Sequence, residues 1–138
     1  MSTRDLLQFA QEAIKNKGYP HKEVYIDRVA EEAKDRLNKK FGIDVDDIVT
    51  DTGSVWHAYK KSAHNLEKDD IIHAVEVINT STDIEPSGEH QNNPTFIFKK
   101  DIDGEISFLV EARIKNKKLL VANFWRKKKK RRHPDASS

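Results

Sequence analysis

The sequence predicts an α+β fold, in which N-terminal helices pack on a small C-terminal antiparallel β-meander. Two observations predict this class. Apolar residues recur every three or four positions in the first half of the chain, whereas residues 95–126 alternate with a period of two between polar turns. The chain has 138 residues, of which 36% are hydrophobic, and this composition allows one small core.

Four helices are expected before residue 80, each from an apolar stripe at helical spacing. They cover residues 5–17, 22–41, 55–63 and 69–78. Gly18 and Gly42 end the first two, because glycine readily adopts the left-handed conformation that follows a helix. Between the helices, residues 43–50 are expected to form a short connection, extended only around Ile48 and Val49.

The second half of the chain is expected to hold a polar loop and then three strands. Residues 79–93 are predicted to be the loop, because this polar stretch contains Pro86 and Gly88. The strands cover residues 95–99, 105–113 and 119–126, with turns at 101–104 and 115–117.

Charge is distributed unevenly. Residues 1–94 carry 12 Lys and Arg against 18 Asp and Glu, whereas residues 95–133 carry 13 against 4. Residues 126–133 include seven of these cations, and such a run repels itself. We therefore expect three parts: a helical extension at 1–21, an α+β domain at 22–128 and a disordered basic tail at 129–138. The basic end indicates an anionic partner such as nucleic acid.

Several functional classes are not expected from this composition. The chain has no cysteine, which excludes a disulfide scaffold and a cysteine nucleophile, and which fits a reducing compartment such as the cytoplasm. No apolar run approaches the roughly 20 residues of a membrane span, and no signal peptide is recognisable. The histidine spacing does not match a zinc hydrolase, and no glycine-rich phosphate loop occurs. No metal, other cofactor or membrane partner is therefore expected.

His57 is the first candidate for chemistry. Lys60 and Lys61 follow it at helical spacing, so that an imidazole and an ammonium group share one helix face. This pair suits a phosphodiester, because histidine titrates near neutral pH and lysine offsets phosphate charge. The alternative is a partly buried histidine beside two solvated lysines.

Glu111 and Arg113 are the second candidates, and they share one face of a predicted strand. A carboxylate beside an arginine can act as a general base next to a phosphate clamp, or it can be an ordinary surface ion pair. Trp125, followed by Arg126 and Lys127, combines an aromatic ring for base stacking with phosphate-binding cations, although the ring can instead cap the core. Alternation alone does not place Glu111 on the same face as Trp125, and a bulge or a different register would decide this.

Several short motifs occur in a characteristic order. They lie at residues 32–42, 55–61, 68–78, 98–100, 110–113 and 120–127. With these motifs, the chain from about residue 28 to 130 resembles the phage-associated nuclease domains of the barnase/EndoU/colicin/RelE-like superfamily, which occur in phage proteins and polymorphic toxins. Two positions differ from the family. Ser62-Ala63 replaces a frequent His-Gly pair, with His64 displaced by two residues, and Asn123 and Trp125 stand where Thr and Tyr are frequent.

The resemblance implies a toxin domain that cleaves RNA without a metal ion, using the 2′-hydroxyl as the nucleophile. It implies that His57 is an acid or base and that Glu111 is the second proton-transfer group. Positive charge near the reacting phosphate would come from Lys61, Lys99 and Arg113. The remaining expected RNA contacts are Lys60, Lys100, Asn123, Trp125, Arg126 and Lys127. RNA is the expected partner, and a cognate immunity protein is a further candidate. The alternatives are a non-catalytic nucleic-acid-binding module and a phage structural or interaction domain.

Overall fold

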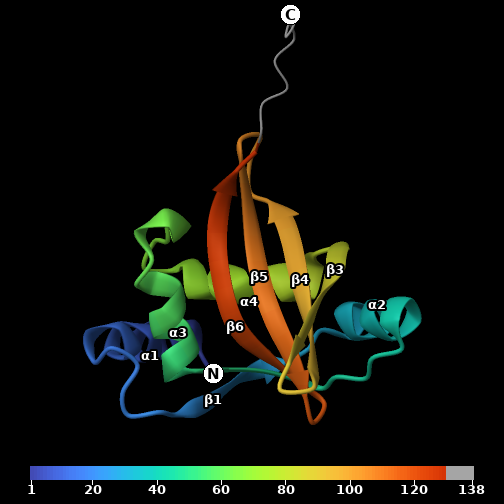
Figure 1. Cartoon of the computed structure of the whole chain (residues 1–138), viewed down its shortest axis with the longest axis horizontal. Helices are drawn as coiled ribbons and strands as arrows, with labels where there is room; N and C mark the ends of the chain where they lie inside the picture. Colours follow the sequence, from blue (N-terminus) through green and yellow to red (C-terminus); the bar gives the residue numbers. More distant parts are fainter. Residues whose placement is uncertain (130–138) are drawn as a thin grey trace, which may run out of the picture.

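The computed structural model describes residues 1–129 and contains a six-stranded sheet with four α-helices (Figure 1). The helices are α1 (Thr3–Lys15), α2 (Glu31–Phe41), α3 (Thr52–Tyr59) and α4 (Asp70–Thr80), with a short 3-10 helix, η1 (Ser62–His64). The strands are β1 (Glu23–Arg28), β2 (Asp47–Asp51), β3 (Asp83–His90), β4 (Asn93–Asp101), β5 (Ile106–Lys115) and β6 (Lys118–Lys128). The order across the sheet is β1-β2-β6-β5-β4-β3.

The predicted meander is present as β4, β5 and β6, which pair antiparallel in sequence order. The expectation of a small, purely antiparallel sheet is wrong, because β2 joins β6 in parallel and brings β1 with it. The hydroxyl of Thr50 donates to the carbonyl oxygen of Val121 at 2.9 Å inside this pairing. The sheet is therefore mixed, and its N-terminal strands complete it on one side.

The helix expected over residues 22–41 is two elements. Its first part is β1, an edge strand in which Ile26 alone is buried, and only residues 31–41 are helical, as α2. The sequence predicts one helix over both parts because Ile26, the single inward residue of β1, falls at a helical spacing from Val29 and Ala33. Gly42 ends α2 in the left-handed conformation with φ 68°, as predicted.

Two segments expected to lack regular structure are strands. Residues 47–51 form β2, so the extended conformation expected at Ile48 and Val49 is confirmed within a longer strand. Residues 83–90 form β3, although this segment is polar and contains Pro86 and Gly88. β3 tolerates both residues because it lies at the sheet edge and has an irregular register between Pro86 and Glu89. The helix expected over 55–63 ends at Tyr59, and the helix expected over 5–17 covers Thr3–Lys15.

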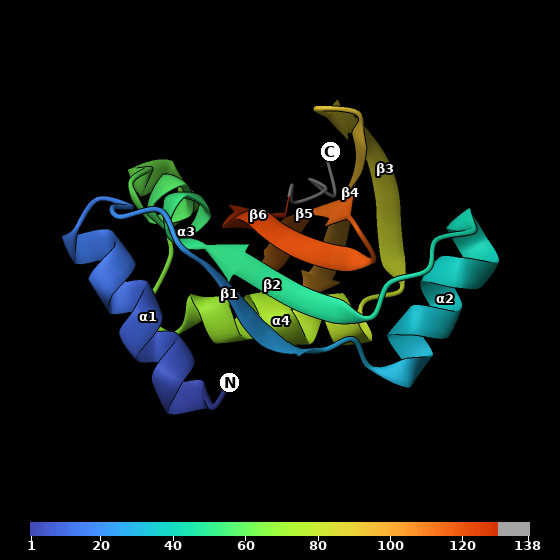
Figure 2. The same ribbon diagram turned by 90° about the horizontal axis from the view of Figure 1, so that it is seen from below.

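The two faces of the sheet have different surroundings. One face packs on α4 and carries the largest buried rings, those of Phe98, Phe108 and Phe124, against Ile71 and Ile78 of α4. Figure 2 shows α4 lying along this face and α3 standing beside the edge of β6. No helix within residues 1–129 crosses the middle of the opposite face, which we call the open face.

Two further expectations concern the ends of the chain and the membrane. Within the described residues, none of the helices has the length and apolarity needed to cross a bilayer. The tail expected to be disordered lies, apart from Lys129, outside the described residues.

Candidate active site

One extra residue in β6 determines which side chains reach the open face. Arg113 of β5 lies opposite Leu120 of β6. Glu111, two residues earlier on β5, lies opposite Asn123, which is three residues after Leu120, so the register shifts by one residue between these two pairs. Ala122 is the extra residue of the resulting bulge. Without the bulge, alternation would turn Asn123 toward α4. With it, Glu111 and Asn123 share the open face.

The same register places on the open face most of the predicted site residues that belong to the sheet. Trp125 lies opposite Leu109, and Leu109 lies opposite Lys99 on its other side. Lys127 lies opposite Ser107, two residues from Leu109. Alternation therefore places six predicted site residues on the open face: Lys99, Glu111, Arg113, Asn123, Trp125 and Lys127.

Helix α3 supplies the histidine. It begins directly after β2, where the side chain of Asp51 accepts a hydrogen bond from the backbone N–H of Ser54 at 2.7 Å. The helix packs against β6, and the ring of Tyr59 meets the ring of Phe124 edge-on at a centroid distance of 5.6 Å. This packing places His57 beside the part of β6 that follows the bulge.

His57 is partly buried, and its surroundings shift its protonation equilibrium. Burial lowers the pKa of the imidazole, and the positive charges of Lys61 and Lys60 and the ring of His64 lower it further. The carboxylate of Glu111 opposes this shift. His57 and Glu111 are therefore close enough for the charge of one to act on the other.

His64 belongs to the same region and was not among the predicted site residues. Its Nδ1 lies 2.7 Å from the carbonyl oxygen of Ala58, and its ring centroid lies 6.0 Å from that of Trp125. Because a carbonyl oxygen only accepts, Nδ1 carries a proton and Nε2 is the basic nitrogen of the neutral ring. The sequence signal was its position two residues after the place where the family frequently has a second histidine, whereas its approach to Trp125 depends on the β6 bulge.

Two predicted RNA contacts lie on the α4 side of the sheet. The guanidinium of Arg126 donates to both carboxylate oxygens of Asp70, at 2.7 and 2.8 Å, and the Asp70 side chain is fully buried. The ammonium of Lys100 donates to the hydroxyl of Thr80 at 2.7 Å and lies 3.8 Å from Glu76. Both cations thus contact α4, whereas Lys60 and Lys61 at the end of α3 are exposed.

Asp70 also takes part in an acidic cluster. Within residues 1–129, donor atoms of Asp69, Asp70 and His73 lie within 4.8 Å of one another, which is a spacing that could hold a metal ion. Both oxygens of Asp70 already accept from Arg126, so a cation would have to displace the guanidinium. The cluster lies at the start of α4, on the side of the sheet away from Glu111.

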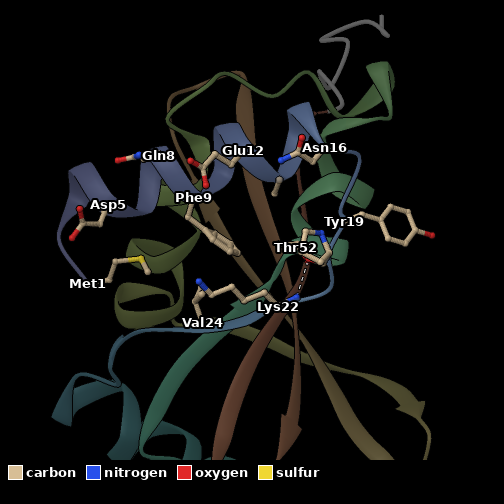
Figure 3. Close-up of a pocket in the computed structure, with 12 residues that line it drawn as sticks. Met1, Asp5, Gln8, Phe9, Glu12, Asn16, Tyr19, Lys22, Val24 and Thr52 are labelled. Carbon is tan, nitrogen blue, oxygen red and sulfur yellow. Dashed lines mark hydrogen bonds between the residues drawn. The ribbon is translucent and has the colours of Figure 1, made fainter.

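A groove of about 320 Å³ lies apart from the open face, between α1 and β1 (Figure 3). Phe9 points from α1 toward β1, and the backbone N–H of Lys22 donates to the hydroxyl of Thr52 at 3.1 Å. The carboxylates of Asp5 and Glu12 line its α1 side. This groove contains none of the predicted site residues, and its acidic wall does not suit a phosphate.

Comparison with known proteins places the chain in a family. No curated protein and no solved structure matches it. Residues 27–133, from the end of β1 onward, match the family described as phage-Barnase-EndoU-ColicinE5/D-RelE like nuclease 3. This match confirms the predicted resemblance and leaves α1 outside the matched region. Because it covers more than half of the chain, the protein belongs to this family of nuclease-like domains.

Proposed function

We propose that the domain is a metal-independent endoribonuclease that cleaves RNA by attack of the 2′-hydroxyl on the adjacent phosphate. The observation that carries this proposal is that His64 lies beside Trp125 at one edge of the open face and that the charges of His64 and Glu111 act on His57. Two imidazoles supply the base and the acid that this reaction needs. The family match supports nuclease chemistry in general.

We assign the base to His57. Its lowered pKa keeps the imidazole neutral and able to accept a proton near pH 7. The 2′-hydroxyl proton passes to His57 as the 2′-oxygen bonds to phosphorus, and Glu111 stabilises the imidazolium that forms. Glu111 therefore assists the proton transfer, and it is the alternative carrier if His57 acts as the acid.

We assign the acid to His64. Its Nδ1–H is held by the Ala58 carbonyl, so its Nε2 carries the exchangeable proton. Protonated at Nε2, it gives this proton to the 5′-oxygen as the bond from phosphorus to that oxygen breaks. The products are a 2′,3′-cyclic phosphate and a 5′-hydroxyl, and the two histidines end with exchanged protonation states.

Cations on and beside the open face stabilise the charge of the transition state. Arg113 lies two residues from Glu111 on the same face of β5, Lys61 follows α3, and Lys99 lies on β4. Preorganised cations of this kind typically contribute a large share of catalysis on phosphates. Trp125 offers its ring for stacking a base, which is tolerant of sequence.

The proposed partner is single-stranded RNA, and the proposed location is the cytoplasm of the producing or target bacterial cell, where RNA is present. As a toxin domain of phage origin, it would require a protein that covers the open face in the producing cell. A cognate immunity protein would meet this requirement by blocking His57 and Glu111.

The test is degradation of RNA by the purified domain in EDTA, with DNA of the same sequence as the control. Cleavage of RNA alone, leaving 2′,3′-cyclic phosphate ends, supports the proposal, because DNA lacks the nucleophile. Cleavage that EDTA abolishes contradicts the metal-independent mechanism. Salt-sensitive binding of RNA without cleavage would instead support a binding module, which the excess of cations in residues 95–133 favours as the second candidate. If RNA neither binds nor is cleaved, a structural or interaction domain becomes the better interpretation.

A further inference from the structure

A second pocket lies on the open face, at the end of β5 and β6 that is remote from α3. Its volume is about 180 Å³, and it is lined by Glu23, Val49, Lys115, Asn116, Lys118 and Leu120. Its position on the open face follows from the pairing. Leu120 lies between Arg113 on β5 and Val49 on β2, and Arg113 shares the face of Glu111. The pocket and the proposed catalytic residues are therefore parts of one surface.

The step from the catalytic residues to this pocket is short. Same-face neighbours along a strand are separated by about 6.6–6.8 Å. Arg113 is one such step from Glu111, and Lys115 is one step further in the same direction. A chain bound along β5 would thus pass from Glu111 over Arg113 into the pocket.

The lining combines an apolar floor with a charged rim. Val49 and Leu120 are 3% and 8% exposed, and neither belongs to the core on the α4 side. At the rim, Lys118 lies 3.5 Å from the carboxylate of Glu23, and Lys115 stands on the other side of the Asn116 turn. Within residues 1–129, the Nε–H of Arg113 is buried without a hydrogen-bond partner. An apolar floor beside cationic donors fits a flat ring that carries an anion.

We propose that this pocket binds the nucleotide that lies one position beyond the two nucleotides joined by the cleaved phosphate. Its base lies on Val49 and Leu120. Lys115 binds the phosphate that joins this nucleotide to the nearer of those two, and Arg113 lies between that phosphate and the cleaved one. The assignment rests on the proposed RNA substrate. A volume of 180 Å³ suits one base and is below that of drug-sized ligand sites.

Binding of short RNA tests this subsite independently of cleavage. The probes are a dinucleotide with a 2′-O-methyl group at the scissile position and two trinucleotides, each extended by one nucleotide on either the 5′ or the 3′ side. We expect one of the extensions to tighten binding to the wild-type protein at least fivefold. In Lys115→Gln the extended and unextended probes should bind within twofold of each other, and Lys115→Arg should restore the difference.

Lys39→Gln on α2 is the matched control, because Lys39 is an exposed lysine outside the open face and should leave the fivefold difference intact. The subsite is wrong if neither extension tightens binding, or if the difference survives in Lys115→Gln. The catalytic proposal is tested separately by cleavage of the unmodified RNA. Cleavage without an extension effect overturns the subsite alone, and an extension effect without cleavage overturns the mechanism alone.

Discussion

Glu111 and Asn123 lie directly opposite each other on the open face, on either side of the β5–β6 pairing. The extra residue at Ala122 produces this pairing and also turns Phe124 into the core, where its side chain is fully buried. Slipping β6 by one residue would expose Phe124 and bury Asn123 and Trp125 together. Core packing therefore fixes the arrangement of the proposed site.

Replacing His57 by alanine tests its proposed role as the base. We expect turnover to fall by about 10²–10⁴-fold, because a positioned proton acceptor is lost. RNA binding should change little, because a neutral imidazole adds little charge. Single-turnover cleavage and the melting temperature should be measured on the same sample. Full activity in a folded His57→Ala protein would remove this residue from the mechanism.

Charges of opposite sign near His57 should shift the pH dependence of cleavage in opposite directions. Lys61 lowers the pKa of His57, so Lys61→Gln should raise that pKa and move the acidic limb of kcat/KM to higher pH. Glu111 raises the pKa of His57, so Glu111→Gln should lower that pKa and move the acidic limb of kcat/KM to lower pH. Lys39→Gln, far from α3, should not move the limb. Shifts of the same sign in the Lys61 and Glu111 variants would contradict the assignment of this limb to His57.

The ion pair between Arg126 and Asp70 should contribute to stability more than an exposed pair does. Arg126→Gln leaves the fully buried carboxylate of Asp70 without its cationic partner, and we expect a loss of about 3–5 kcal/mol in the free energy of unfolding. Urea denaturation measures this loss. Lys129→Gln, which removes a more exposed pair with Asp101, is the control and should cost about 0–1 kcal/mol. Equal effects of the two variants would contradict the prediction.

Gly18 tests how tightly the N-terminal helix is joined to the helix that bears His57. Its φ is +81°, and an added Cβ would lie 3.2 Å from the Cβ of Trp56. Gly18→Ala should therefore destabilise the protein by about 1–2 kcal/mol, mainly through backbone strain. Gly104→Ala, at a position with open space, is the matched control for thermal denaturation. A Gly18→Ala protein as stable as the control would show that the loop adjusts freely.

Residues 130–138 lie outside the described residues, but their sequence supports a prediction. They include Lys130, Arg131 and Arg132, which can neutralise phosphates. Deleting them should weaken RNA binding and flatten its salt dependence, by about 0.7 in the log–log slope for each lost phosphate contact on a single strand. Loss of cleavage at saturating RNA and low salt would contradict a role limited to affinity.

The sequence predicted the elements whose pattern is local. The alternation in β4, β5 and β6 was visible because core-facing and outward residues are chemically distinct there. The sequence of β1 predicts a helix because its single buried residue, Ile26, cannot define the period of a strand. The sequence of β3 predicts a loop because Pro86 and Gly88 are rare inside a sheet, although an edge strand tolerates both. The pairing of β2 with β6 leaves no local signal, since its partners are far apart in the chain.

The candidate site was predictable in its residue types and not in its arrangement. His57, Glu111 and Trp125 could be named from their chemistry, but whether they share a surface depends on the bulge at Ala122. The same dependence explains why His64 was missed. Arg126 is a predicted RNA contact that the structure assigns to an internal ion pair. Its position beside Trp125 suits RNA binding, but its partner Asp70 lies 56 residues away in sequence and leaves no local signal.

The pairing of β2 with β6 also affects when the site can form during synthesis. The hydrogen bond from Thr50 to Val121 spans 71 residues, so a long loop must close before these strands meet. Until β6 has been made and has joined β2, neither Asn123 nor Trp125 can lie beside α3. A nascent chain that lacks β6 therefore has His57 without the surface that β6 supplies. This order delays any activity that depends on these residues until β6 has been synthesised and paired.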